Sequence, residues 1–265
     1  MTLITLSIGD LLIAAMLVVV VALLSWRLHL GSSRQLLIAA VRSAVQLMLL
    51  GFVLKLLFES SSLPFIALLS LFMLSVAGYE VMARQRRRFT GYWGYGIGAV
   101  SMFISSFTIM LLTLLVIIQP DPWYKPQYAI PLLGMLLGNT MTGVAVGLDN
   151  LTRNAWEQRN QIEARLILGQ GWSKAIADIR KEALRSGLIP IINAMAAAGV
   201  VSLPGMMTGQ ILAGSPPYEA AKYQLLIMYL ITAGTGFGSL AAVWLGSRHL
   251  FDERHRLRLE RLRKK

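Results

Sequence analysis

The stretch LSIGDLLIAAMLVVVVALLSW, from Leu6 to Trp26, decides the class of this protein, because Asp10 is the only charged residue in it. A bilayer core about 30 Å thick is crossed by about 20 residues at helical rise, so this stretch predicts a membrane-spanning helix. The whole chain has the same character. Of its 265 residues, 55% are hydrophobic and 14% are charged, whereas soluble domains carry roughly 25% charged residues. The composition therefore excludes a soluble fold.

Six further apolar runs of similar length follow the first one. We expect an all-α integral membrane protein with seven spans, forming a single transmembrane domain over residues 1–265. The fourth run is longer than a bilayer requires, which favours a tilted helix or one with an interfacial end. The predicted spans cover residues 6–26, 35–58, 63–83, 92–119, 128–150, 188–214 and 223–247.

The positions of Lys and Arg predict the orientation of these spans. The loops after spans one, three and five and the basic tail, residues 248–265, hold 21 of the 25 basic residues. Because cytoplasmic loops are enriched in Lys and Arg, we expect the N-terminus outside and the C-terminus inside. Clusters such as 84–88 could also indicate nucleic-acid binding. Membrane insertion and anionic headgroups already account for them, so we expect no nucleic-acid partner.

One inner segment, residues 151–187, is long enough to do more than connect two spans. Its pattern predicts two helices separated by Gly169-Gln-Gly171. Several of its side chains are apolar although the segment lies outside the bilayer, which indicates either a protein partner or burial in the headgroup interface. These side chains are Leu166, Leu168, Trp172, Ile176 and Ile179.

The sequence contains no recognisable catalytic motif. The three histidines lie in basic inner segments, and there is no zinc-protease motif, nucleophile elbow or Walker A motif. Cysteine is absent, so thiolate metal sites are excluded. The glycine clusters at 91–98 and 234–238 favour close packing between helices. We therefore expect no enzyme activity and no bound cofactor, so any ATP and Mg²⁺ would bind to another chain.

Polar residues within the spans are candidates for a transport path, because they are costly in lipid. Gln46 and Asn139 fall near the middle of their spans, and each could instead form an interhelical hydrogen bond. Arg42 and Glu80 lie at comparable depths and could form a buried ion pair, or Arg42 could extend its head to the interface.

The sixth predicted span contains a helix breaker in its outer half. Pro204 and Gly205 should interrupt or kink the helix, and a broken helix frees backbone carbonyls that can coordinate ions. Met206, Met207 and Gln210 could add thioether and amide ligands for a metal ion, although Met is also a common filler of apolar cores. The predicted path comprises Gln46, Asn139, Met141, Asn193, Met206, Met207 and Gln210.

Together these features resemble a known family over essentially the whole chain. The motifs that carry the resemblance are Arg42-x-x-x-Gln46-Leu47, Pro131-Leu-Leu-Gly-Met135 with Gly138-Asn139, Arg185-x-Gly-Leu-Ile-Pro-x-Ile-Asn193, and Leu203-Pro-Gly-Met-Met-Thr-Gly-Gln-Ile-Leu212. The family is that of the FetB-type ABC permeases implicated in iron export, whose plant relatives are membrane subunits tied to aluminium tolerance. The resemblance implies a permease, working as two copies with two cytoplasmic ABC ATPase subunits, that exports metal ions across a bacterial inner membrane.

A second likeness concerns the inner segment. Many ABC permeases contact their ATPase through a loop that begins Glu-Ala-Ala-x-x-x-Gly and has Ile ten residues after the Gly. Glu163, Ala164, Gly169 and Ile179 match this spacing, while Arg165 replaces the second Ala and the Leu-Pro expected after Ile179 is absent. The likeness implies an ATPase-coupling loop formed by Glu163, Ala164, Gly169, Trp172 and Ile179.

Two other functions fit the same composition. A secondary transporter or channel would work without ATP and would require a titratable residue near the midplane, but Glu80 and Asp149 both lie near inner span ends. A membrane scaffold or sensor would transport nothing. The donors present are compatible with iron, manganese, zinc or aluminium, and they do not exclude an organic substrate.

Overall fold

The computed structural model describes residues 7–60 and 62–264, and the side chains of residues 7–58 and 62–264. The described chain is mostly helical and divides into two compact units, one of residues up to Ser62 with Leu212–Gly214 and one of the remaining residues. Among the described residues, six helical segments are long and apolar enough to cross a membrane. The prediction of a helical, multi-pass membrane protein is confirmed.

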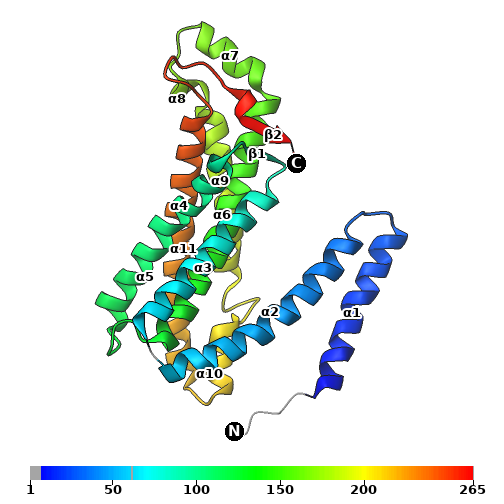
Figure 1. Ribbon diagram of the computed structural model, residues 1–265, viewed down its shortest axis with the longest axis vertical. Helices are drawn as coiled ribbons and strands as arrows, with labels where there is room; N and C mark the ends of the chain where they lie inside the picture. Colours follow the sequence, from blue (N-terminus) through cyan, green and yellow to red (C-terminus); the bar gives the residue numbers. More distant parts are fainter. Residues whose placement is uncertain (1–6, 61, 265) are drawn as a thin grey trace. The chain divides into compact units, whose positions relative to one another are not determined.

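The first unit is a pair of long helices, α1 (Ile8–Arg27) and α2 (Ser33–Ser60), joined by a short turn (Figure 1). Ser7 caps α1, because its side chain accepts a hydrogen bond from the backbone of Asp10, whose carboxylate accepts one in return. In the turn, His29 and Gly31 have positive φ angles, and the hydroxyls of Ser25 and Ser32 lie 2.8 Å apart.

The second unit is a helical bundle built around α6 (Pro126–Glu157), which contacts α3 (Leu63–Arg84), α9 (Ala177–Ala197) and α11 (Pro217–His249) (Figure 1). Glycines bring these helices close together. A Cβ atom at Gly143 would lie 2.5 Å from Cγ2 of Thr235 on α11 and 3.0 Å from the carbonyl oxygen of Gly187 on α9. A Cβ atom at Gly238 would come similarly close to the side chain of Thr140. The expected close packing of glycines within the spans is therefore present along α11.

The overlong fourth span contains two wider helical turns. Its segments are α4 (Tyr92–Met102), α5 (Thr108–Leu112) and the π-helical turns η1 (Phe103–Phe107) and η2 (Thr113–Ile118). A π turn advances less per residue than an α turn because each turn holds more residues. The segment therefore takes up its extra residues as wider turns.

The predicted span over 188–214 is not one helix. It is divided between the last part of α9 and the short helix α10 (Gly205–Leu212), with residues 198–204 between them in non-helical conformations. Gly199 adopts φ +83° there, which glycine tolerates at no steric cost. The helix is interrupted on the N-terminal side of Pro204.

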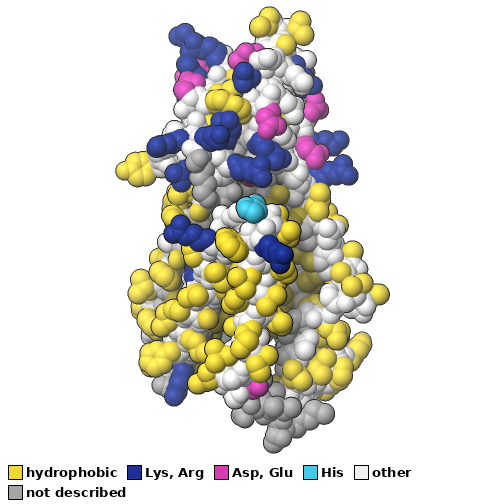
Figure 2. Space-filling model, turned by 90° about the vertical axis from the view of Figure 1, so that its right-hand side faces the viewer, with side chains coloured by type: hydrophobic (Ala, Val, Ile, Leu, Met, Phe, Trp, Pro, Cys, Tyr) yellow, Lys and Arg dark blue, Asp and Glu magenta, His cyan; other side chains and the backbone are white. Residues whose placement is uncertain are grey.

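One end of the second unit carries most of its charged side chains. It holds the short helices α7 (Arg159–Ile167) and α8 (Trp172–Ala175), the turn η3 (Leu259–Arg261) and a two-stranded antiparallel sheet of β1 (Arg87–Phe89) and β2 (Leu262–Lys264). Figure 2 shows Lys and Arg gathered over this end and hydrophobic side chains over the spanning helices. We call this region the basic end.

The C-terminal tail is folded at the basic end. Leu250 and Phe251 are buried, and Phe89 pairs with Leu262 across the small sheet. This sheet departs from the all-α prediction. Its strands read Arg-Arg-Phe and Leu-Arg-Lys, which are too short and too charged to show the alternating pattern of a strand.

Candidate functional site

A stripe of polar side chains lies on the neighbouring faces of α6 and α9. Asn139 and Asn150 are eleven residues apart on α6, and Ser186 and Asn193 are seven apart on α9, so each pair shares a helical face. The amide of Asn150 donates a hydrogen bond of 3.1 Å to the hydroxyl of Ser186, which places the two faces side by side. Asn139 and Asn193 are exposed in the single chain.

The stripe ends in a cavity of about 380 Å³ near the basic end, lined by Arg84, Thr142, Asp149 and Arg153 among others. The carboxylate of Asp149 accepts a hydrogen bond of 2.7 Å from the backbone of Arg86. Polar groups facing lipid are costly, so this face favours contact with water or with more protein. The predicted path residues Asn139 and Asn193 therefore lie on the exposed faces of α6 and α9 that meet at the bond between Asn150 and Ser186.

The helix interruption after α9 opens a second cavity, of about 260 Å³. Three methionines line it, Met195, Met207 and Met228, together with Gln224. Gln224 is 8% exposed, and its side-chain oxygen has no hydrogen-bond partner among the described residues. The cavity thus combines thioethers, which are soft donors, with an unsatisfied amide oxygen, which is a hard donor, and both kinds can bind a metal ion.

This cavity holds only part of the ligand set predicted from sequence. Met207 lines it, whereas Met206 packs against the hydrophobic core and Gln210 is not among its lining residues. The side-chain oxygen of Gln210 is buried without a partner in the described part of the chain. Met195, Met228 and Gln224 were missed, because in sequence they are single residues in apolar helices and only the interruption brings them together.

The remaining predicted path and ion-pair residues lie elsewhere. Met141 packs against the core of the second unit, and Gln46 is exposed on α2 in the first unit. Arg42 and Glu80 belong to different units, so their pairing stays a prediction. Glu80 lies 3.9 Å from Arg84 one turn along α3. Among the described residues, no three His, Asp or Glu side chains form a group that could hold a metal ion.

The predicted coupling loop forms a tight helical turn at the tip of the basic end. Ile167 and Leu168 are 86% and 80% exposed at the end of α7, and Gly169 follows with φ +82°. Glu163 and Ala164 are also exposed. Exposed apolar side chains at the tip of a charged surface are typical of a protein interface.

Beneath this tip, α7 and α8 are fixed to the bundle. Arg165 and Asp178 form an ion pair of 2.6 Å between α7 and α9, and Ile162, Ile176 and Ile179 are buried. Arg165 replaces the second Ala of the permease motif, and its ion pair holds α7 against α9. Of the apolar side chains predicted to be exposed here, Leu168 is exposed, whereas Ile176 and Ile179 pack into the core, so the expectation is wrong for these two. Leu166 and Trp172 are partly buried against the core, and Ile167 is exposed although it was not predicted.

Trp172 connects the coupling turn to the folded tail. It is partly buried, its ring lies 6.0 Å from that of Phe251, and the guanidinium of Arg248 lies 5.6 Å from its ring centre. Helix α8 therefore contacts both α9 and the end of α11.

Comparison with known proteins agrees with the resemblance inferred from the motifs. The chain is 38% identical to a UPF0014 membrane protein of Synechocystis sp., with 89% of this chain and 90% of the relative aligned. It is 32% identical to the probable iron export permease protein FetB of Escherichia coli, over 97% of this chain and 96% of the relative.

A plant relative, protein ALUMINUM SENSITIVE 3 of Arabidopsis thaliana, is 34% identical, over 92% of this chain and 88% of the relative. No solved structure matches the chain. The model of the uncharacterised protein family UPF0014 matches residues 8–251. This chain therefore belongs to the UPF0014 family of membrane proteins, which confirms the resemblance to the FetB-type permeases.

Proposed function

We propose that this chain is the permease subunit of an ATP-driven exporter of metal ions, with iron as the substrate. A separate cytoplasmic ATPase binds ATP and Mg²⁺, and this chain catalyses no reaction itself. The observation that carries the proposal is the exposed Ile167–Leu168 tip on a braced turn, in a chain 32% identical to a probable iron export permease. The basic end lies in the cytoplasm of a bacterium, and the helices span its inner membrane.

In this proposal, α9 is the mechanical link between the turn and the membrane interior. Helix α9 has 21 residues and spans about 30 Å at helical rise. Arg165 and Asp178 attach its first turn to α7, and its last turn borders the methionine-lined cavity. Movement of the ATPase against the turn would shift α9 and reshape that cavity, which is the form of alternating access that we propose.

Two copies of the chain complete the transport path in this proposal. The stripe containing Asn139 and Asn193 is exposed in one copy, and a second copy would cover it and exclude lipid. The substrate ion would then pass between polar groups of both copies and the thioether of Met207. Gln46, Met141, Met206 and Gln210 stay predictions for this path.

Co-purification with an ATPase tests the proposal. We expect the chain, isolated from its native membrane, to retain one stoichiometric Walker A protein whose ATP hydrolysis is stimulated by Fe²⁺. Leu168→Glu should reduce recovery of the ATPase at least tenfold, because it places a charge in an apolar contact. Gln170→Glu is the matched control, since it adds the same charge in the same turn without removing an apolar side chain.

Recovery of no ATPase, in a detergent that preserves another ABC complex, would contradict the proposal. Ion flux through vesicles that contain this chain alone and that depends on a proton gradient would favour the secondary transporter. Absence of flux under all these conditions would favour the membrane scaffold.

A further inference from the structure

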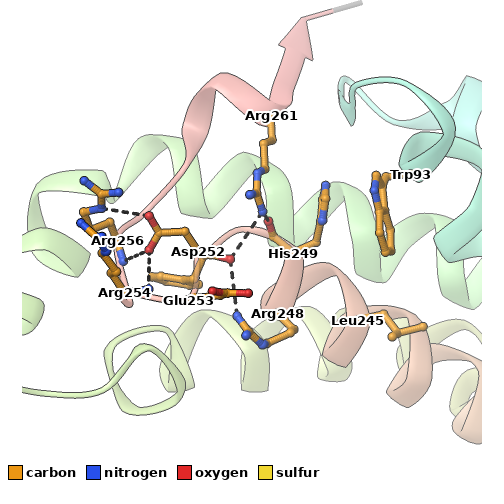
Figure 3. A pocket seen from close by; sticks show the side chains of 10 residues that line it. Trp93, Leu245, Arg248, His249, Asp252, Glu253, Arg254, Arg256 and Arg261 are labelled. Atoms are coloured by element: carbon orange, nitrogen blue, oxygen red, sulfur yellow. Dashed lines mark hydrogen bonds and ion pairs between the residues drawn. The ribbon is translucent and has the colours of Figure 1, made fainter.

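A large cavity of about 850 Å³ lies at the basic end, where α11 finishes and the tail begins (Figure 3). Arg248, Arg254, Arg256 and Arg261 line its polar part, together with Asp252 and Glu253. Trp93 and Leu245 line its apolar part, on the opposite side from Arg254 and Arg256 in Figure 3. The proposed transport path uses none of these residues.

The arginines of this cavity are not all engaged by protein groups. Arg261 donates hydrogen bonds to the backbone oxygens of His249 and Phe251 and so holds the tail in place. The carboxylate of Asp252 forms ion pairs with Arg256 at 2.9 Å and with Arg258 at 3.0 Å. Arg254 is exposed, and its side chain makes no hydrogen bond or ion pair within the described chain.

The lining holds four arginines and two carboxylates, those of Asp252 and Glu253, so it has an excess of positive charge. Arg248 contributes to it, because its closest hydrogen bond, to the backbone oxygen of Phe251, is long at 3.5 Å. Guanidinium groups with free donors bind phosphate oxygens in a favourable geometry. A phosphate-bearing anion is thus the ligand that fits the polar part of the cavity.

The apolar part places this ligand in the membrane surface. Helix α11 is a candidate span that ends at His249, so the cavity lies where lipid headgroups would be. Trp93 is 53% exposed and stacks on His249 with ring centres 4.4 Å apart. Tryptophan is enriched at this level of membrane proteins, where its ring contacts both headgroups and acyl chains.

We propose that this cavity binds the phosphate of an anionic phospholipid headgroup, with Arg248 and Arg254 as its ligands and Trp93 and Leu245 against the glycerol and acyl region. The bound lipid fastens the end of α11 to the tail. Since Arg248 and Phe251 also contact Trp172 of the coupling turn, lipid binding stabilises the position of α8. Lipid binding at this site requires neither the substrate nor the ATPase.

Native mass spectrometry of the purified full-length chain tests this site. We expect it to retain one dioleoyl-phosphatidylglycerol more tightly than dioleoyl-phosphatidylcholine. Arg254→Gln should weaken retention about fivefold, which corresponds to the loss of one charge near the headgroup, and Arg254→Lys should restore most of it. Arg263→Gln is the matched control, because it removes one tail charge from a residue outside the cavity.

Equal loss with Arg254→Gln and Arg263→Gln would overturn the proposal, since the attraction would then come from the whole tail. No loss with Arg254→Gln would overturn it as well. Competition with inorganic phosphate shows whether the bound phosphate group belongs to a lipid headgroup or to a soluble ion. Retention of lipid against millimolar phosphate supports the lipid headgroup, whereas displacement at that concentration assigns the same phosphate site to the soluble ion.

Discussion

Gly143 lies where three helices meet, and its missing side chain sets their spacing. An alanine there would place a methyl group 2.5 Å from Thr235 and 3.0 Å from the backbone oxygen of Gly187. We expect Gly143→Ala to lower the free energy of unfolding by about 1 to 3 kcal/mol, the usual effect of overpacking. Thermal denaturation of the purified chain in detergent measures this change.

Gly138→Ala on the same helix is the control, because nothing lies within 4 Å of its added methyl group. It should leave stability unchanged or raise it by up to about 1 kcal/mol through helix propensity. Equal effects of the two substitutions would contradict the packing described between α6, α9 and α11. The sequence predicts close packing by such glycines, but it does not indicate which glycine meets which helix.

The tail between α11 and β2 is held by a carboxylate at its first turn. Burial of Asp252 raises its pKa, but hydrogen bonds from the backbone and side chain of Arg256, the charge of Arg256 and the backbone of Arg254 outweigh this effect and lower the pKa to about 2. A lowered pKa stabilises the fold above the unfolded value of about 4, and this contribution is lost as the pH falls toward 2.

We therefore expect the tail to stay folded from pH 7 to about pH 5 and to loosen below about pH 4. Amide hydrogen exchange of residues 250–264, corrected for the intrinsic effect of pH, measures this. Asp252→Asn should make the tail loose at pH 7 and remove the pH dependence. Glu253→Gln, at the exposed neighbouring residue, should change neither.

Among the secondary-structure elements, the sequence predicts the helices that are encoded by a continuous run of apolar residues. The apolar runs at 63–83 and 223–247 fall within observed helices, and so do residues 8–26 of the first run, because about 20 apolar residues in a row can be satisfied only by a spanning helix. The interruption after Ala197 and the sheet of β1 and β2 depend on a positive φ at Gly199 and on pairing between residues far apart. Pro204 and Gly205 predict an interruption in this span, but no local pattern indicates that it begins after Ala197 or that β1 pairs with β2.

The candidate sites show the same difference between features that a contiguous stretch of sequence encodes and features that depend on the fold. The position of the coupling turn is predictable, because Gly169 and its motif are contiguous in sequence. The brace between Arg165 and Asp178 and the cavity formed by Met195, Met207 and Gln224 require the fold. The sequence therefore locates the candidate elements but not the partner residues that the fold brings to them.

For the whole molecule, the polar stripe on α6 and α9 predicts how two copies meet. The chain contains no cysteine, so a single Asn139→Cys variant gives one reactive thiol per copy. If a second copy covers the stripe, a short bis-maleimide should join two Asn139→Cys chains in native membranes, and a denaturing gel would show a dimer band. Trp244→Cys is the control, because residue 244 is 53% exposed on α11.

The comparison of the two variants decides where the interface lies. Cross-linking of Asn139→Cys without cross-linking of Trp244→Cys places the second copy on the stripe, since an exposed thiol that faces lipid meets another only by chance collision. The reverse result would place the interface on α11 and leave Asn139 and Asn193 facing lipid or another protein. In that case the transport path would have to lie within one copy, and the cavity lined by Met207 would be its first candidate.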